Sequence, residues 1–416
     1  MSAQRSVLAD EGEAEGSAGT AQPLVPSQAR PAVRSDDGSV ARPGRPARIW
    51  SYAWLPLLAY LLGHLLHGAA AYWFGFDWLS TDSRIRWDGG IYLGIAETGY
   101  SAGPCAQVYP AGPNPDGLCG NAGWFPLLPY LVLALMKAGL GSATAGVLIV
   151  EACALGLLVA LSRLLDPART AVKVACLAVA ALLPSGVYFH ATFPMSLAVL
   201  LILVTFLLLV RGRWVLAGLT GMVAATAYPL AVLLAPAAVV FLLIPPGRWA
   251  RRRLAIAAYV GGLTGTGVLA VFGVMHLATG RYDAYLAIQS SNYGHGVHNP
   301  ITTFLTLLEW QPATVSAELL FSTGLVLFAA VALAAAAVRR QATALDWTLG
   351  AVYGPLLLIA PLVVGAGQAQ FRSHTLLLPV VLLLRHLRWP VAAGLAALGS
   401  PLAFLMTGLF LTRALV

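Results

Sequence analysis

The stretch from Thr81 to Tyr100, TDSRIRWDGGIYLGIAETGY, gathers the side-chain types that acid–base and anion-binding chemistry requires. Asp82 and Asp88 supply carboxylates, which accept protons as general bases, and Arg86 supplies a guanidinium, which binds anions. The indole of Trp87 lies between Arg86 and Asp88 in the sequence. Charged side chains are scarce in the rest of the chain, so this cluster is the first candidate for a functional site.

The rest of the chain has the composition of a membrane protein, and it must position this cluster. Of its 416 residues, 58% are hydrophobic and 10% are charged, whereas soluble domains carry about 25% charged residues. Apolar windows of roughly 20 residues, the length of one span, recur from Ser51 to the C-terminus. We therefore predict an all-α polytopic membrane protein. The net charge of +8 fits basic cytoplasmic loops better than nucleic-acid binding.

The N-terminal segment, residues 1–48, differs in composition from everything that follows. It is rich in Ser, Ala, Gly, Pro and charge, and it lacks an apolar period. Such a segment buries too little apolar surface to fold, so we predict a disordered cytoplasmic tail before a transmembrane domain at 49–416. Basic residues precede the first span at 51–74, which places the loop at 75–144 outside the cytoplasm.

An apolar stretch at residues 124–141 decides on which side every later loop lies. If it spans the membrane, Arg163 and the Arg248–Arg253 cluster lie outside; if it lies along the outer interface, they lie in the cytoplasm. The positive-inside rule favours the interfacial helix, and Pro126 and Pro129 shorten the segment further. We therefore predict that the extracytoplasmic loop carries juxtamembrane helices.

With that choice, the C-terminus lies outside and the N-terminus lies in the cytoplasm. The predicted spans, about eleven in number, cover residues 51–74, 145–165, 171–189, 193–210, 214–228, 229–245, 254–278, 316–338, 345–366, 373–387 and 390–412.

Four cysteines divide into two classes by their surroundings. Cys153 and Cys176 fall inside apolar segments and are expected to pack as small core residues. Cys105 and Cys119 lie in the polar loop, where an extracytoplasmic location favours a disulfide between them.

The segment RWDGGIYLGIAETGY resembles a sequence pattern of the PIG-V-like mannosyltransferases, the family of the second mannosyltransferase of GPI-anchor assembly. The matching positions are Arg86, Trp87, Asp88, Tyr92, Ile95, Ala96, Gly99 and Tyr100. Three later segments are similar to family elements in the same order: WFPLLP from Trp124, PSGVYFHATFPMSL from Pro184 and FRSHTLLLP from Phe371. The second of these departs from the family, because Pro194, Met195 and Ser196 stand where relatives usually carry an acid.

The resemblance implies a GT-C-type fold and a membrane-embedded mannosyltransferase, and the Arg-heavy, Ala-rich composition suggests a bacterial source. Such an enzyme takes the sugar, mannose in this family, from a polyprenyl-phosphate-linked donor. It transfers the sugar to a hydroxyl of a glycolipid or lipoglycan acceptor on the extracytoplasmic face. No cofactor beyond the lipid-linked donor is implied, and a divalent metal stays open as an alternative, although no residue spacing predicts a metal site.

In such a transfer, Asp88 is the first candidate for the general base and Asp82 is the second. A structural alternative for Asp88 is the N-cap of a helix that runs to Thr98, because Gly89 follows it and Gly99 ends the helix. The two roles are compatible.

A cationic side chain is needed to bind the donor phosphate. Arg372 is the first candidate for this role, because it matches a family position. Arg281 and Arg86 are the alternatives, and all three suit pairing with lipid headgroups equally well. Candidates for lining the sugar pocket are the aromatic and imidazole residues Trp87, Tyr92, Tyr188 and His190; an interfacial aromatic belt is the competing explanation for the aromatic ones.

A polytopic transporter or lipid flippase is the alternative from another functional class. Transporters place charges near the bilayer midplane and often contain internal repeats. The sequence has one clear mid-span acid, Glu151, and no evident repeat, which favours the enzyme.

Overall fold

The computed structural model describes residues 45–108, 114–166, 168–244, 250–309, 312–365, 367 and 369–415. Nearly all of the predicted disordered tail, residues 1–48, therefore lies outside the described residues. The described chain is built from helices and a single two-stranded sheet, as the apolar composition predicts. It is an all-α polytopic membrane protein.

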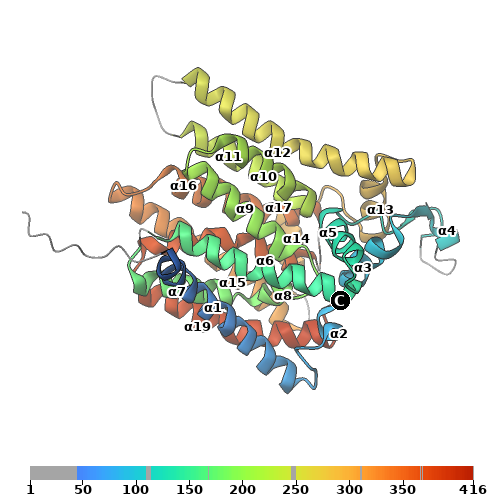
Figure 1. Ribbon diagram of the computed structural model, residues 1–416, viewed down its shortest axis with the longest axis horizontal. Coiled ribbons are helices and arrows are strands. Elements are labelled where there is room, and N and C mark those ends of the chain that lie inside the picture. Colours follow the sequence, from blue (N-terminus) through green and yellow to red (C-terminus); the bar gives the residue numbers. More distant parts are fainter. Residues whose placement is uncertain are drawn as a thin grey trace, which may run out of the picture. The chain divides into compact units, whose positions relative to one another are not determined.

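Six helical segments are each long and apolar enough to cross a membrane, counting only the described residues. They are α1 (Arg45–Trp73), α6 (Ser142–Leu164), α12 (Ala250–Thr279), α15 (Ala313–Val338), the run from α16 (Ala344–Trp347) through the π-helix η3 (Thr348–Tyr353) to α17 (Gly354–Val364), and α19 (Trp389–Leu411). In Figure 1, α1 and α6 lie on one side of the bundle and α12 lies at the opposite edge, beyond α10 (Trp214–Ala227) and α11 (Leu234–Leu243).

One further pair of helical segments is apolar and long enough to cross when taken together, but it is bent in its middle. Helix α7 (Thr170–Ala181) continues at an angle of 64° into the turn η1 (Pro184–Gly186) and the short helix α8 (Val187–His190). Pro184 has no backbone N–H to give to the preceding turn, which explains the break. The bend carries His190 into the interior, where it is 6% exposed.

The remaining apolar helices are shorter than a full span. They are α5 (Leu127–Lys137), α9 (Met195–Val210), α10 (Trp214–Ala227) and the pair η2 (Pro229–Leu233) and α11 (Leu234–Leu243). The 11 residues of α5 extend only about 16 Å, roughly half of a bilayer core, so this helix is too short to cross.

The predicted span at 373–387 forms differently from its neighbours. After α18 (Ala369–His374), the chain continues as a 12-residue 3₁₀ helix, η4 (Thr375–His386). A 3₁₀ helix rises about 2.0 Å per residue, so these residues cover roughly 24 Å. Leu376–Leu378 and Val380–Leu384 are fully buried, so η4 is enclosed by protein and does not face lipid.

Small residues allow the helices to approach closely. A side chain at Gly267 of α12 would collide with the Met222 carbonyl of α10, and one at Gly221 would collide with the Thr264 hydroxyl. Such contacts between backbones are the usual source of helix association in lipid.

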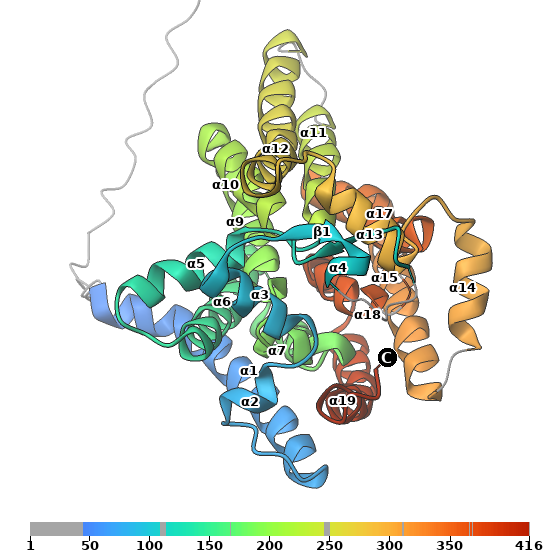
Figure 2. The ribbon, with the colours of Figure 1, turned by 90° about the vertical axis from the view of Figure 1, so that its right-hand side faces the viewer.

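One end of the bundle carries the short elements, which face the viewer in Figure 2. They include α2 (Thr81–Arg84), α3 (Asp88–Thr98), α4 (Cys105–Val108), α13 (Ala284–Tyr293) and α14 (Pro300–Leu308). Strands β1 (Ala102–Pro104) and β2 (Leu118–Gly120) pair antiparallel, with Ala102 opposite Gly120. The Thr81–Tyr100 stretch belongs to this end.

Candidate functional site

Asp88 is the first residue of α3, and a strained turn points it toward the bundle. Trp87, which precedes it, has φ 53° and ψ −129°, a conformation that residues with a Cβ rarely adopt. Backbone strain of this kind costs about 1–3 kcal/mol and concentrates at functional sites. Helix α3 ends at Gly99, whose φ of 83° suits glycine.

The carboxylate of Asp88 forms an ion pair with the guanidinium of Arg372 in α18. The two residues are 284 positions apart in the chain. The helix N-terminus has no side-chain cap, so the alternative role of Asp88 as an N-cap is wrong. Its side chain is 19% exposed and that of Arg372 is 25% exposed, so both remain within reach of a ligand.

Arg372 is suited to binding a second anion. Burial alone would lower the pKa of Arg372, but the charge of Asp88 raises it above its ordinary value, so the guanidinium stays charged. Its Cζ lies 5.9 Å from the centre of the Phe193 ring. Its Nε is buried and has no hydrogen-bond partner among the described residues, so this donor is left unsatisfied.

The ion pair forms part of the wall of a cavity of about 220 Å³. This volume is below the roughly 300–1,000 Å³ of a typical drug-sized pocket, and suits one small polar group better than an extended chain. The lining side chains come from both sequence halves: Asp88, Tyr92, Gly123, Trp124, Phe125, Tyr228, Pro229, Leu230, Tyr285, Leu286, Gln289, His295, Pro361, Val364, Arg372 and Ser373.

Two polar side chains of this cavity, those of Tyr228 and Gln289, were not candidates from the sequence. Tyr228 hydrogen-bonds to Ser373 at 2.9 Å, and Gln289 donates to the Gly123 carbonyl at 2.6 Å. Burial, then the charges of Arg372 and His298, lower the pKa of His295, which keeps its imidazole neutral at pH 7. Only proximity to the Thr81–Tyr100 stretch would have marked Tyr228 and Gln289, and proximity is a tertiary property.

The hairpin after α3 holds the far wall of the cavity in place. Cys105 and Cys119 form a disulfide across it. Asn292 of α13 donates to the Leu118 carbonyl at 2.7 Å, and Asn114 donates to the Ser291 carbonyl at 2.9 Å. The hairpin thus fixes α13, the helix that carries Tyr285 and Gln289.

The aromatic residues expected at a sugar pocket divide between the cavity and its support. Tyr92 lines the cavity. Tyr188 packs edge-on against Phe193 at 5.2 Å between ring centres and is not a lining residue. Trp87 also lies outside the lining, and its contribution is the strained turn before Asp88.

The second-choice charged residues lie away from the cavity lining. Asp82 is exposed in α2, and Arg281 forms an exposed ion pair with Asp283 at 2.7 Å. The guanidinium of Arg86 lies 5.3 Å from the Phe76 ring. Among the described candidates, therefore, only Asp88, Tyr92 and Arg372 meet at the cavity.

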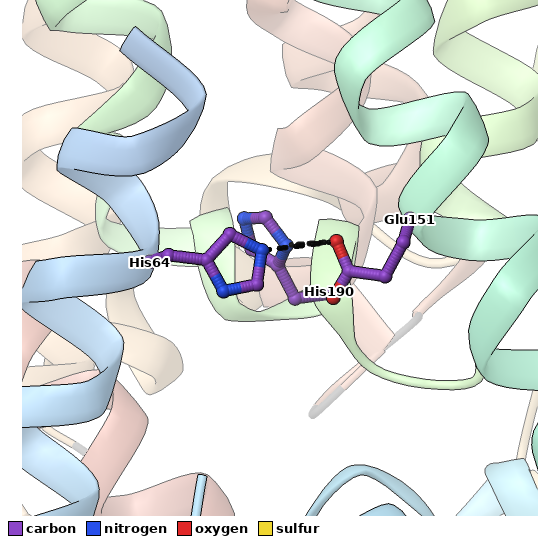
Figure 3. Close-up of side chains that lie close together, drawn as sticks. All are labelled: His64, Glu151 and His190. Carbon is purple, nitrogen blue, oxygen red and sulfur yellow. Dashed lines mark hydrogen bonds and ion pairs between the residues drawn. The ribbon is translucent and has the colours of Figure 1, made fainter. Parts of the chain in front are cut away.

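His190 belongs to a different cluster, centred on Glu151 of α6 and drawn in Figure 3. His190 Nδ1 lies 3.0 Å from Glu151 Oε2, and His64 Nε2 from α1 lies 3.1 Å from the same oxygen. Tyr60 donates to it at 2.7 Å, and Arg84 pairs with the other oxygen.

The ligand atoms of His64, Glu151 and His190 lie within 4.8 Å of one another, which is close enough to hold a metal ion. The hydrogen bonds argue against one. Trp78 Nε1 donates to His64 Nδ1 at 3.1 Å, and because an indole N–H only donates, the imidazole proton must sit on Nε2. A metal at Nε2 would require that proton on Nδ1, directly facing the indole N–H. The geometry therefore fits a carboxylate bound by four donors.

A second buried acid, Glu318, also has hydrogen-bonding partners within the protein. Glu318 is fully buried inside α15. It contacts His374 Nδ1 at 2.9 Å and accepts from Ser322 at 2.9 Å. His374 lies two residues after Arg372, so this contact steadies α18.

No protein-family model matches this chain, and no curated protein matches it either. The site's chemistry is therefore argued from its geometry.

Proposed function

We propose that this protein is a membrane-embedded glycosyltransferase. It transfers a hexose, which we take to be mannose, from a polyprenyl-phosphate-linked donor to a hydroxyl of a glycolipid or lipoglycan acceptor. The reaction takes place on the extracytoplasmic face, within a GT-C-type fold of about eleven spans. The observation that carries the proposal is the Asp88–Arg372 pair in the wall of a small cavity at one end of the bundle.

In this reaction Arg372 binds the phosphate of the donor. Its side chain is 25% exposed, and the planar fork of its guanidinium matches the oxygens of a phosphate ester. As the bond between the anomeric carbon and the phosphate oxygen breaks, negative charge grows on the leaving polyprenyl phosphate. The guanidinium stabilises that charge, which is the usual task of a preorganised cation in group transfer.

Asp88 takes the proton of the acceptor hydroxyl as its oxygen bonds to the anomeric carbon. Before the donor binds, this carboxylate is paired with Arg372. A donor phosphate competes for the same guanidinium and so releases Asp88 as a base in the loaded site. The base would thus become available when the donor is present.

The test is transfer from radiolabelled polyprenyl-phosphate mannose by purified protein in lipid. Asp88→Asn should lower the rate by about 10²–10⁴-fold, the range of general-base assistance. Asp82→Asn is the matched control, because it removes the same charge from the same segment but lies outside the cavity lining, and it should keep the wild-type rate. A wild-type rate for Asp88→Asn would rule out Asp88 as the base. An inactive wild-type protein with this donor would contradict the proposed reaction.

A transporter or lipid flippase is the second candidate, and the buried acids Glu151 and Glu318 are the observation in its favour. Ionisable groups inside a membrane commonly mark transport pathways. Both carboxylates are bound by donors of the protein itself, which supports a structural role instead. Movement of an ion or lipid across liposomes by the purified protein, without sugar transfer, would favour transport.

A further inference from the structure

The Glu151 carboxylate joins three separate parts of the chain. Tyr60 and His64 come from α1, Arg84 from α2, and His190 from α8. Arg84 and Glu151 are both largely buried, with side chains 6% and 15% exposed. A charge that deep is held at a fixed position, because moving it away from its partner leaves it unpaired in a poorly polarisable surrounding.

Arg84 uses its remaining groups to fix the turn that leads to Asp88. Its Nε donates to the Trp78 carbonyl at 3.0 Å, and its backbone carbonyl accepts from the Thr192 N–H at 3.0 Å. Gly89 also lies close to Thr192, because a Cβ at Gly89 would lie 3.3 Å from the Thr192 carbonyl oxygen. The segment from Arg84 to Gly89 is thereby pressed against the turn after His190.

The turn after His190 also contacts Arg372, the partner of Asp88 in the ion pair. Phe193, three residues after His190, lies beneath the guanidinium of Arg372 and beside the ring of Tyr92. A carboxylate that holds Arg84 and His190 together therefore sets the distance between the Asp88 turn and the surface on which Arg372 rests.

We propose that Glu151 is a positioning residue: its ion pair with Arg84 and its hydrogen bond to His190 hold Asp88 opposite Arg372. The functional part of this inference rests on the proposed glycosyl transfer, whereas its structural part does not. Glu151 touches no substrate, and it acts through the backbone of the Arg84–Asp88 turn.

The experiment compares Glu151→Gln with the double variant Arg84→Met/Glu151→Gln. The single variant leaves the buried Arg84 without a counter-charge, so it should lower the thermal unfolding midpoint of purified protein. The double variant removes both charges, and the glutamine still accepts from Tyr60 and the histidines, so the midpoint should return toward that of wild type. Asp166→Asn, which breaks the more exposed pair with Lys173, is the control and should leave the midpoint unchanged.

The positioning role is read by hydrogen–deuterium exchange of peptides that cover residues 78–90. Exchange in residues 78–90 should rise in both Glu151 variants, because neither retains the ion pair between Arg84 and Glu151. Peptides from α15 should keep wild-type protection in the stable double variant. Recovery of wild-type exchange in the double variant would overturn the proposal. Zinc bound in equal amount to wild-type protein, and lost in Glu151→Gln, would overturn it in favour of a metal centre.

The catalytic consequence is measured separately. A misplacement of about 1 Å can lower a rate by 10²-fold, so the double variant should lose kcat on that scale at an unchanged donor KM. Wild-type kcat in a double variant with loosened residues 78–90 would also refute positioning. If wild-type protein shows no transfer, the proposed function fails while the exchange result still decides the role of Glu151.

Discussion

At the scale of single residues, Asp88 and Arg372 form the ion pair in the cavity wall. The charge of Asp88 raises the pKa of Arg372 above its ordinary value, so the guanidinium stays charged. In the reaction that we propose, the donor phosphate would bind this guanidinium and release the carboxylate to accept the proton of the hydroxyl. The strained turn at Trp87 makes sense in this context, because it points the first residue of α3 into the cavity instead of along the helix.

His295 gives the cavity a pH dependence with a definite sign. Its pKa is lowered below 6.5 by burial, and then by the charges of Arg372 and His298. The unfolded chain therefore binds a proton as the pH falls through 6.5, whereas the folded protein resists it. Folding stability should decrease from pH 7 downward, until the pH passes below the folded pKa.

His295→Gln should remove this part of the acid destabilisation. The thermal unfolding midpoints of wild-type protein and the variant, measured from pH 8 to pH 5, should show a smaller decrease for the variant. The values at pH 8 serve as the internal control, because the imidazole is neutral there in both states. Parallel curves over the whole range would contradict this assignment.

At the scale of secondary-structure elements, short pieces position the site and long helices support them. The β1–β2 hairpin holds α13, and the buried Glu318–His374 contact holds α18. Each piece is too short to be stable alone, so its position depends on polar ties to the bundle. The rigidity of the site therefore depends on these polar contacts.

The disulfide between Cys105 and Cys119 is the covalent tie of the hairpin. It closes a sequence separation of 14 residues, and closing a loop of that size contributes up to about 3 kcal/mol of stability. The double variant Cys105→Ala/Cys119→Ala should lower the unfolding midpoint and increase exchange in residues 284–293, because α13 loses its anchor. Added reductant should act on wild-type protein and leave this variant unaffected.

Cys153→Ala is the matched control for that experiment, because Cys153 is a free, buried cysteine in α6. It should keep the wild-type response to reductant. Unchanged exchange in α13 of the double alanine variant would show that the hydrogen bonds from Asn292 and Asn114 suffice.

At the scale of the whole molecule, the sidedness of the bundle decides whether the cavity is extracytoplasmic. Helix α6 separates two exposed basic residues, Lys137 before it and Arg169 after it. Because α6 is long enough to span, these residues belong on opposite sides of the membrane. The positive-inside argument expects Lys137 outside and Arg169 in the cytoplasm.

Cysteine labelling of intact cells tests this expectation. In a background without Cys153 and Cys176, a membrane-impermeant thiol reagent should label Lys137→Cys from outside. Arg169→Cys should react only after the membrane is opened. The reverse pattern would place the cavity on the cytoplasmic side and would remove the extracytoplasmic donor from the proposal.

The sequence alone determined the class of this protein, because hydropathy and charge are local and additive properties. Apolar windows predicted the helices, the Pro126–Pro129 region predicted a helix too short to span, and the polar loop predicted its disulfide partners. Composition could not distinguish the enclosed 3₁₀ helix η4 from a lipid-facing span, because both are equally apolar.

Only the tertiary structure decided which charges meet. Asp88 and Arg372 are 284 residues apart, and their contact depends on how α3 and α18 rotate and pack against the turn after His190. The same packing moved His190 from the expected sugar pocket to the Glu151 cluster and brought Tyr228, Tyr285 and His295 into the cavity. A pairing across a helix bundle is set by interlocking side chains over the whole molecule, so no local pattern in the sequence contains it.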